Sequence, residues 1–532
     1  MHVVLWDTRQ RDVAKDFAGG FGVGQYPGDG TLRGRLVRWF FKRDRRPVAL
    51  LYAHLAAIFA KLGHSVEYVE DTVGQVSNLP VGRVSDLPNQ AQAVPRQVEN
   101  LPHVENLPHV ENLPRADLYV FCPSLITLDL ERQVMAGLLA ARPSARVLVV
   151  GTVASVLPEA FDGLAVTVVK GEAEQLLWRL DDVLDRPGAT IQLGILEDLD
   201  ALPFPDWSLF APRRFRIAYD FWKFPTALVL ASRGCALRCN YCPYTVLDNS
   251  TRPRDPQCVA DEIRHGIQRW GFRSFKFRDP LFGLDRNRVL QLADHIGRLP
   301  QPIQFSVETR IELLPPETLR LLKRVGLTSV TIGIETPDAA TLDRYRRAPV
   351  DADRQREFIA TCRALGIRTV AGFMIGFPDD TEESVRRVWQ YAISLDPTLA
   401  NFNVVTPYPG TRFFETMRPK IADFDFRRYT VYSPVLRYEH LTPQRVSELL
   451  GKCFRRFYFR WQYLRDNAHL LWPGLRRMGV GRGKATATAD GPHDRVPAPR
   501  TGLDVLARKG LRTDGPHQTG RVSDQAGDCL AE

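Results

Sequence analysis

SRGCALRCNYCPY, at residues 232–244, carries three cysteines that one short loop can wrap around a single metal centre. They are Cys235, Cys239 and Cys242. Thiolates hold iron–sulfur clusters, and three protein thiolates on a four-iron cluster leave one iron open to an exogenous molecule. Zinc is the alternative, but zinc sites normally close a tetrahedron, and the nearest further candidates, Cys258 and His265, lie in a predicted helix. The spacing therefore favours a 4Fe-4S cluster over zinc.

The CxxxCxxC spacing, with the aromatic Tyr241 before the last cysteine, resembles the cluster loop of the radical S-adenosylmethionine (SAM) enzymes. The resemblance implies that the open iron chelates the amino and carboxylate groups of SAM. It also implies that an electron from the cluster cleaves SAM to a 5'-deoxyadenosyl radical, with an external donor such as flavodoxin or ferredoxin. In enzymes of this kind the cofactor carries the hard chemistry, while the protein orients the reactants and excludes water.

Length and composition limit the remaining possibilities. A chain of 532 residues exceeds the size of a single core, so we expect two or three domains. Eight scattered cysteines and a strand-like start, MHVVLWD, predict a cytoplasmic, reducing environment rather than a secreted disulfide scaffold. No stretch approaches the roughly 20 apolar residues of a membrane span. The charge of +10 is a modest excess of 71 basic over 61 acidic residues, which does not favour nucleic acid as a partner.

Residues 1–185 alternate apolar strand-like runs with helix-like segments, which predicts a flavodoxin-like (Rossmann-like) parallel sheet. A helix is expected over 47–63, because the segment starts at a proline and stops at a glycine. The expected strands are 3–6, 65–69, 118–122 and 147–150.

Residues 74–115 interrupt this domain with VENLP units that begin at 98, 104 and 110. A proline in every unit prevents a continuous helix or central strand, and the few leucines cannot bury a core. We predict a disordered insertion here, and a second disordered segment in the Gly-, Pro- and Thr-rich tail at 478–532.

Residues 226–415 repeat a strand followed by a helix, after an expected linker at 186–225. Six such units predict a partial (β/α)6 barrel, whose active site lies at the carboxyl ends of the strands. The cysteine loop directly follows the first unit's strand, and a small helical region is expected at 416–477. The expected strands are 227–231, 274–278, 303–307, 329–334, 369–375 and 401–405.

Polar residues end several of these strands. They are Asp279, Glu308, Arg310 and Glu335. Taken singly, each could cap the next helix or form a surface ion pair. Together they are expected to surround one opening, at the carboxyl ends of the barrel strands.

The resemblance to the radical SAM enzymes covers all of 226–415, and it implies roles for these residues. It rests on FRDPLF (277–282), SVETR (306–310), IGIET (332–336), FMIGFP (373–378) and PYPGT (407–411). Glu308 and Glu335 would contact the amino acid or ribose of SAM, and Arg347 would pair with its carboxylate through the guanidinium fork. Backbone around Tyr241 and Ile375 would cradle the adenine. Asp379 and Asp380 stand where relatives often have glycine and glutamate, which puts any role of Glu382 in doubt.

The amino-terminal unit resembles the cobalamin-binding domain that precedes the radical domain in one large subgroup. The matching segments are KLGHSVEYVED (61–71), ADLYV (116–120), VGTVASVLPE (150–159) and VVKGEAE (168–174). The resemblance implies that cobalamin binds over the carboxyl ends of the strands. The DxHxxG segment of cobalt-ligating proteins is missing, as it is in many members of this subgroup, and Thr152 stands where many relatives have glycine. His64 precedes a strand and is interpreted as a surface or capping residue.

We therefore expect a radical SAM enzyme that abstracts hydrogen from an unactivated carbon of a small-molecule or lipid-like substrate. Cobalamin would add methyl transfer, and without it cyclisation, rearrangement or oxidation is expected. One alternative is methylthio transfer to RNA or a ribosomal protein, which needs three amino-terminal cysteines, whereas only Cys122 precedes Cys235. Another is a non-catalytic iron–sulfur redox sensor, which would have no need of the polar strand ends.

Two segments, 32–43 and 453–465, mix aromatic and basic residues at roughly helical spacing. Such helices can lie on an anionic membrane, here at its inner face. The interpretation that we favour for 453–465 is a helix that closes the open side of the barrel, with its arginines solvated.

Overall fold

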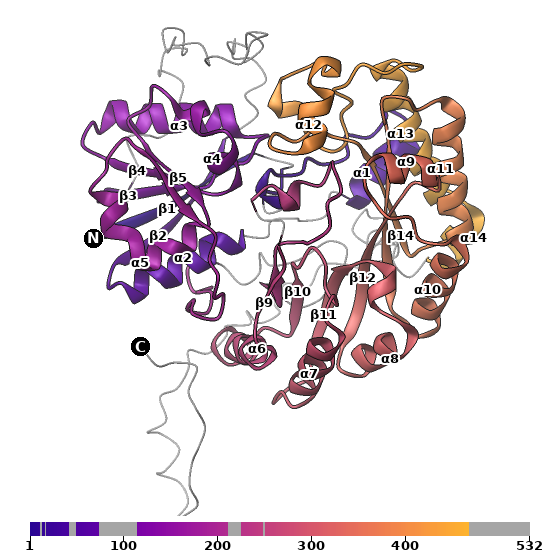
Figure 1. Cartoon of the computed structure of the whole chain (residues 1–532), viewed down its shortest axis with the longest axis horizontal. Coiled ribbons are helices and arrows are strands. Elements are labelled where there is room, and N and C mark those ends of the chain that lie inside the picture. The colour runs from indigo at the N-terminus through magenta and orange to yellow at the C-terminus, as the bar shows by residue number, and fades with distance from the viewer. Residues whose placement is uncertain are drawn as a thin grey trace, which may run out of the picture. The chain divides into compact units, whose positions relative to one another are not determined.

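A computed structural model describes residues 1–10, 13–15, 18–41, 49–73, 114–210, 225–247 and 250–467. Met1–Leu470 form one compact unit that contains two six-stranded parallel sheets (Figure 1). The α/β class and both parallel sheets confirm the expected fold. The predicted insertion and the tail fall on residues outside the described ranges, apart from 114 and 115.

The amino-terminal sheet has the strand order β2-β1-β3-β4-β5-β6, with every neighbouring pair parallel. This is the flavodoxin-like order with a sixth strand added. Its strands are β1 His2–Gln10, β2 Ser65–Val73, β3 Leu118–Phe121, β4 Arg146–Val149, β5 Thr167–Gly171 and β6 Thr190–Gly194.

Strand β6 lies inside the range predicted as linker, so the expected boundary at 185 is too early. The segment alternates buried Ile191 and Leu193 with exposed neighbours, and it pairs with β5. A short half-buried edge strand of this kind gives a weak sequence signal because only two apolar side chains carry it.

Helices cover both faces of the amino-terminal sheet. Alternate residues along β1 and β3 belong to two separate cores, as the two-residue period of a strand requires. One core packs against α2 and α5, and the other against α3 and α4. These helices are α2 Leu50–Lys61, α3 Leu128–Ala141, α4 Thr152–Val156 and α5 Leu176–Leu184.

The second sheet has the order β14-β13-β12-β11-β10-β7, all parallel, which confirms the open (β/α)6 barrel. Its strands are β7 Thr226–Val229, β10 Ser274–Phe277, β11 Gln304–Thr309, β12 Leu327–Glu335, β13 Arg368–Ile375 and β14 Leu399–Val404. Between them run α6 Pro256–Trp270, α7 Arg286–Gly297, α8 Pro316–Arg324, α9 Ala339–Arg344, α10 Ala352–Ala364 and α11 Glu382–Leu395. Asp255, Asp285 and Asp351 cap three of these helices, as residues of this type prefer.

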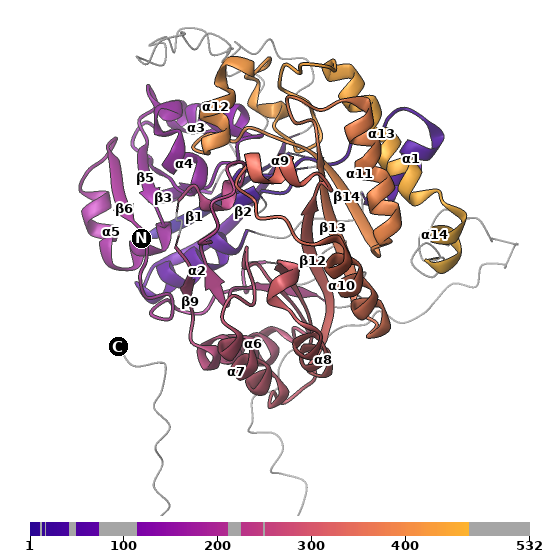
Figure 2. The same cartoon turned by 45° about the vertical axis from the view of Figure 1, so that its right-hand side comes forward.

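The carboxyl-terminal region consists of α12 Arg412–Met417, α13 Pro443–Tyr458 and α14 Trp461–Asp466. Helix α13 packs its apolar face, including Phe454 and Phe457, against α11 and the edge strand β14. It therefore covers the edge strand β14 beside α11, and Arg460, whose segment was predicted to keep its arginines solvated, is instead 15% exposed and pairs with Asp396. Helix α1, Leu32–Phe41, lies beside α13 (Figure 2), so the connection between β1 and α2 reaches the far side of the barrel. No described helix is both long and apolar enough to span a bilayer.

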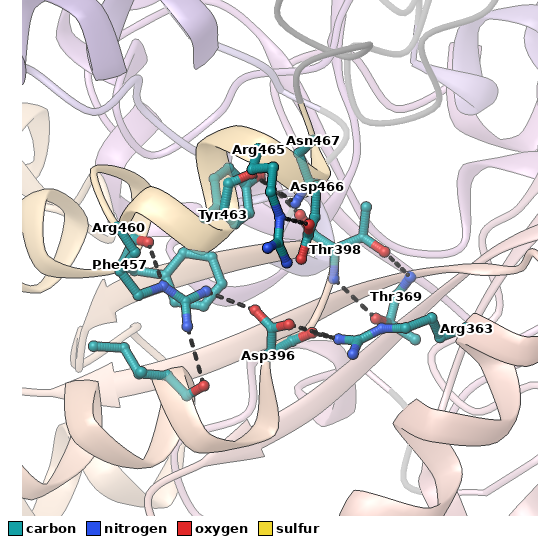
Figure 3. A network of polar contacts seen from close by, with 11 residues as sticks. Arg363, Thr369, Asp396, Thr398, Phe457, Arg460, Tyr463, Arg465, Asp466 and Asn467 are labelled. Carbon is teal, nitrogen blue, oxygen red and sulfur yellow. Dashed lines mark hydrogen bonds and ion pairs between the residues drawn. The ribbon is translucent and has the colours of Figure 1, made fainter.

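An ion-pair network fastens this carboxyl-terminal region to the amino ends of β13 and β14 (Figure 3). Asp396 ends α11 in the left-handed region, at φ +50°, and accepts from Arg460 at 2.7 Å and from Arg363 at 2.8 Å. The Tyr463 hydroxyl donates to the Thr398 carbonyl at 2.9 Å. Because these contacts lie at the amino edge of the barrel, opposite the catalytic edge of such folds, we assign them to stability.

Replacing Asp396 tests that assignment. Asp396→Asn keeps a residue that tolerates the left-handed conformation but removes the charge between two arginines, so we expect a loss of about 1–3 kcal/mol in the free energy of unfolding. Asp396→Ala should lose roughly 1 kcal/mol more, because alanine is strained at this φ. Urea unfolding of both variants measures the two effects, and equal losses would contradict the backbone argument.

Candidate cofactor site at the mouth of the barrel

A small hairpin that sequence analysis did not predict closes the base of the cysteine loop. Strand β8, Ser232–Arg233, pairs antiparallel with β9, Arg252–Pro253. Gly234 follows at φ +78°, a conformation that favours glycine, and turns the chain into Cys235. The hairpin therefore fixes where the loop leaves the barrel.

The three thiols of the loop are free, and those of Cys235 and Cys239 are buried. Burial raises the pKa of Cys235, and it raises the pKa of Cys242 to about 12; a charge on Cys239 would raise both further. The three sulfurs thus lie within electrostatic reach of one another. Among the described residues, no three His, Cys, Asp or Glu side chains stand close enough to hold one metal ion. A cluster binds each thiolate through a separate iron, so this donor set is compatible with a cluster.

Arg347 and Glu335 form a pair beside the loop. The Arg347 Nη2 lies 3.4 Å from the Glu335 Oε1 and donates to the Gly333 carbonyl, and the guanidinium also contacts the Cys239 side chain. A Cβ at Gly333 would lie 2.4 Å from that Glu335 oxygen, so the pair needs glycine beneath it. Glu335 itself is held at φ +68°, an unusual conformation for glutamate, and burial raises its pKa while Arg347 opposes the rise.

Glu308, at the end of β11, lies between two cations from β10 and the residue after it. Its Oε1 is 3.0 Å from the Lys276 Nζ and 2.7 Å from the Arg278 Nη1. Burial alone would raise the pKa of Glu308, but Lys276 and Arg278 outweigh it and hold the pKa below the ordinary 4.5. Arg278 also reaches the Tyr244 hydroxyl at 3.4 Å, which links this trio to the cysteine loop.

The depressed pKa of Glu308 makes a pH-dependent contribution to stability. The contribution is fully present above pH 4.5 and is lost as the pH falls through the lower folded-state pKa, because the unfolded carboxyl then binds its proton first. Glu308→Gln should cost about 3 kcal/mol near neutral pH, since it removes the negative charge that faces two buried cations. Urea unfolding of both proteins across this pH range should show the difference shrinking in acid; a constant difference would contradict the assignment.

Asp279 and Arg310, predicted as cofactor contacts, are engaged with the backbone around the site. The Asp279 carboxylate accepts from the Ala231 N–H at 3.0 Å and from the Ser232 hydroxyl at 2.7 Å, and burial raises its pKa to about 6. Arg310 pairs with Glu312 and donates to the Ala348 carbonyl at 2.9 Å. In this structure Asp279 anchors the start of the hairpin, and Arg310 holds the segment that carries Arg347.

Tyr241 and Ile375 lie on the apolar side of the mouth. The Tyr241 ring meets those of Tyr345 and Phe377 edge to face, each at 6.5 Å, and its buried hydroxyl has no hydrogen-bond partner among the described residues. Ile375 ends β13, and its carbonyl accepts from the Val405 N–H at 2.9 Å. A buried hydroxyl without a partner usually marks a ligand or water, so Tyr241 fits a cofactor site.

The loop after β13 contains Asp379 and Asp380, the residues that depart from the family pattern, and Glu382 follows them. Asp380 accepts from the N–H groups of Gly376 at 2.7 Å and Phe377 at 2.9 Å, so it shapes this loop. Glu382 instead forms an exposed ion pair with Arg445 at 2.7 Å. A role for Glu382 at the site gains no support from these contacts.

The carboxyl edge of the amino-terminal sheet meets the cysteine loop. A Cβ on Gly19 would lie 2.6 Å from the Pro243 carbonyl oxygen, and the Thr152 hydroxyl donates to the Gly19 carbonyl. Two buried hydroxyls in this region, of Thr8, two residues before the end of β1, and of Tyr408, have no hydrogen-bond partner among the described residues. These two hydroxyls could bind a polar group of a ligand at this edge of the sheet. The contacts of Gly19 and Thr152 show that protein atoms fill part of the space at the edge.

Two further groups bear on a cobalamin site. Lys15 lies 3.0 Å from both Asp7 and Glu131 at the switch point between β1 and β3. His64 lies at the opposite, amino end of β2, where its Nδ1 is 3.5 Å from the amino terminus. That position excludes His64 as a ligand at the carboxyl edge.

Comparisons with known proteins agree with this fold. Residues 229–392 match the radical SAM superfamily. An uncharacterized methyltransferase of Pyrococcus horikoshii is 26% identical over 269 residues, 50% of this chain and 58% of that protein. The anaerobic magnesium-protoporphyrin IX monomethyl ester cyclase of Cereibacter sphaeroides is 26% identical, over 51% of this chain and 44% of that protein. The hopanoid C-3 methylase of Methylococcus capsulatus is 27% identical, over 59% and 63%. The chain thus spans less than two thirds of the length of each relative.

Two solved structures share the arrangement of both sheets. OxsB, a cobalamin-dependent SAM radical enzyme solved with aqua-cobalamin and SAM, superposes with a TM-score of 0.58 at 13% identity, over 91% of this chain and 69% of that one. TsrM of Kitasatospora setae, a radical SAM methyltransferase solved with cobalamin and a [4Fe-4S] cluster, gives 0.52 at 14% identity, over 89% and 91%.

The family match defines the class of the barrel domain. Residues 229–392 are a radical SAM domain, the class for which a 4Fe-4S cluster and SAM were expected from the cysteine loop. Over 89–91% of its length, the chain shares the fold of two solved radical SAM enzymes that bind cobalamin.

Proposed function

We propose that this chain holds a 4Fe-4S cluster on Cys235, Cys239 and Cys242 and abstracts hydrogen from an unactivated carbon of a small-molecule or lipid-like substrate. The observation that carries the proposal is the loop of three free thiols, closed by the β8–β9 hairpin, with Arg347 against Cys239. When bound and reduced, the cluster supplies the electron that splits SAM into methionine and a 5'-deoxyadenosyl radical. Flavodoxin or ferredoxin is the proposed donor.

The residues around the loop bind and orient SAM in this proposal. The Arg347 fork offers paired donors for the carboxylate of SAM, and Glu335 offers an acceptor for its ammonium group. Glu308, held between Lys276 and Arg278, is placed for the ribose hydroxyls. Tyr241, Tyr345 and Phe377 form an apolar wall beside the adenine and exclude water from the reacting atoms.

Cobalamin is the proposed second cofactor, with methyl transfer as the reaction. The proposal is supported by the fold likeness to two cobalamin-bound structures and by the buried, unpartnered hydroxyls of Thr8 and Tyr408 at the carboxyl edge. When bound there, cobalamin supplies the methyl group. The relatives include a cyclase as well as methyltransferases, so cyclisation is the reaction to test if no cobalamin binds.

Anaerobic reconstitution with iron and sulfide, followed by reduction and an assay for 5'-deoxyadenosine, tests the proposal. Formation of 5'-deoxyadenosine from SAM supports it. A fully reconstituted and reduced protein that forms none would instead favour the iron–sulfur sensor. The absorbance spectrum of protein produced with cobalamin in the medium decides the second cofactor. Methylthio transfer remains disfavoured, because only Cys122 precedes the loop in the sequence.

We also propose a peripheral contact with an anionic membrane through α1 and α14. Leu32 and Trp461 are 66% and 79% exposed, and the Arg33 guanidinium lies 5.4 Å from the ring of Phe459, two residues before Trp461. Large apolar side chains flanked by arginines suit the interface of an anionic bilayer. Trp461→Ala should reduce co-sedimentation with phosphatidylglycerol vesicles, while Trp178→Ala, at an exposed tryptophan on α5, should not; equal effects would count against this surface.

A further inference from the structure

Four buried charged residues join the amino-terminal sheet to the base of the cysteine loop. Glu172 and Glu174 follow β5, and Arg233 and Arg252 stand opposite each other in the β8–β9 hairpin. Arg252 binds Glu172 through both nitrogens of its fork, at 2.7 and 2.8 Å. Arg233 contacts Glu174 at 2.9 Å and Glu172 at 3.2 Å. We call these four residues the Glu–Arg clamp.

Burial separates the clamp from an ordinary surface ion pair. The side chains of Glu172 and Glu174 are 8% and 6% exposed, and those of Arg252 and Arg233 are 11% and 18%. Exposed pairs contribute little to stability, whereas a buried charge that loses its partner is strongly destabilising. The clamp holds two acids and two bases, so its charges balance only while all four residues are present.

The backbone before the clamp is built to deliver Glu172. Gly171 adopts φ +98°, and a Cβ there would lie 2.2 Å from the Gly194 carbonyl oxygen, so only glycine permits this close approach. The second Glu172 oxygen accepts from the Leu196 N–H at 2.7 Å. Glu172 is therefore fixed by β5, by the segment after β6 and by the hairpin together.

The position of the clamp suggests what it controls. Arg233 is separated from Cys235 only by Gly234, and Asp279 holds the two residues before Arg233 from the barrel side. The entry to the cysteine loop is thus held from the barrel by Asp279 and from the amino-terminal sheet by the two glutamates. We propose that Glu172 and Glu174 are positioning residues that fix Cys235, so that the geometry of the cysteine loop depends on the amino-terminal domain.

This inference deepens the proposed function, because it matters for catalysis only if Cys235 ligates the cluster. It can nevertheless be measured without cofactor. Hydrogen–deuterium exchange on the full chain without cluster or SAM reports how firmly each segment is held. In Glu172→Gln/Glu174→Gln, peptides covering 232–247 should exchange at least about tenfold faster than in the wild type, while peptides covering 396–404 stay unchanged.

Two further variants separate positioning from general stability. Asp396→Asn, which loosens the network at the amino edge of the barrel, should speed exchange at 396–404 and leave 232–247 unchanged. Glu174→Asp keeps the charge and should restore most of the protection lost in Glu174→Gln. If the double variant fails to fold, Glu174→Gln alone leaves Glu172 to both arginines and should give a smaller increase at 232–247.

A lowered melting temperature with unchanged exchange at 232–247 would overturn the proposal, because the clamp would then be merely stabilising. So would a failure of Glu174→Asp to restore protection. The outcome is distinguishable from a failure of the proposed function: wild-type protein that binds no iron on reconstitution would refute the cluster, whereas the exchange measurement on cofactor-free protein would still show whether the clamp holds the loop.

Discussion

Cys239→Ala is expected to abolish iron binding and to lower the rate of SAM cleavage by at least about 1000-fold. Two thiolates on this loop cannot hold a four-iron cluster with a single open iron, and no other cysteine directly neighbours the loop in sequence. Cys239 is also the cysteine that Arg347 contacts, so the change removes a ligand and disturbs the SAM-binding pair at once. Iron content, the visible absorbance of the reconstituted protein and the yield of 5'-deoxyadenosine measure the effect.

Cys362→Ala is the matched control. Cys362 is a free, fully buried thiol on α10 that packs in the barrel core, so its loss should cost some stability while iron content and SAM cleavage persist. Full iron content in Cys239→Ala, or equal loss of iron in the two variants, would show that the loop is not the cluster site.

Arg347→Lys is expected to weaken SAM binding by about 10–100-fold and to leave the iron content unchanged. The guanidinium of Arg347 serves Glu335, the Gly333 carbonyl and the Cys239 sulfur together, and its fork matches a carboxylate. A lysine is a single point charge on a flexible stem and cannot keep this geometry. Equilibrium dialysis of the reconstituted protein against labelled SAM measures the change.

The neighbouring Arg346 provides the control. Arg346 is exposed and makes none of these contacts. The same substitution there, Arg346→Lys, should therefore bind SAM as the wild type does. If both variants bound SAM normally, the carboxylate of SAM would have to be held elsewhere, and the role assigned to Arg347 would fail.

Local patterns in the sequence were enough to predict the cysteine loop, the two parallel sheets and the polar strand ends. Each of these depends on residues close together in the chain: three cysteines on one loop, apolar runs with a fixed period, and polar residues at the ends of several strands. The family match and the fold confirm the class that they predicted. The cysteines as ligands, and Glu308, Glu335 and Arg347 as SAM contacts, stay predictions that the experiments above address.

Other features lay beyond what local patterns can predict. Asp279 stays a predicted cofactor contact, but its hydrogen bonds with Ala231 and Ser232 were not predicted. The short β6 was assigned to a linker, and the segment with α1 was not expected to reach α13. In each case the contact that determines the arrangement joins residues far apart in the chain, and the local sequence does not indicate which residue the partner is.

The sequence by itself therefore predicted the class of chemistry, because ligand type and spacing depend on a few consecutive residues. Only the tertiary structure decided how the loop is held. Glu172 and Arg252 lie 80 positions apart, and their two-pronged contact exists only because two separately wound sheets bring the end of β5 against the β8–β9 hairpin. Because both side chains are largely buried, water cannot replace either partner, and loss of the contact is strongly destabilising.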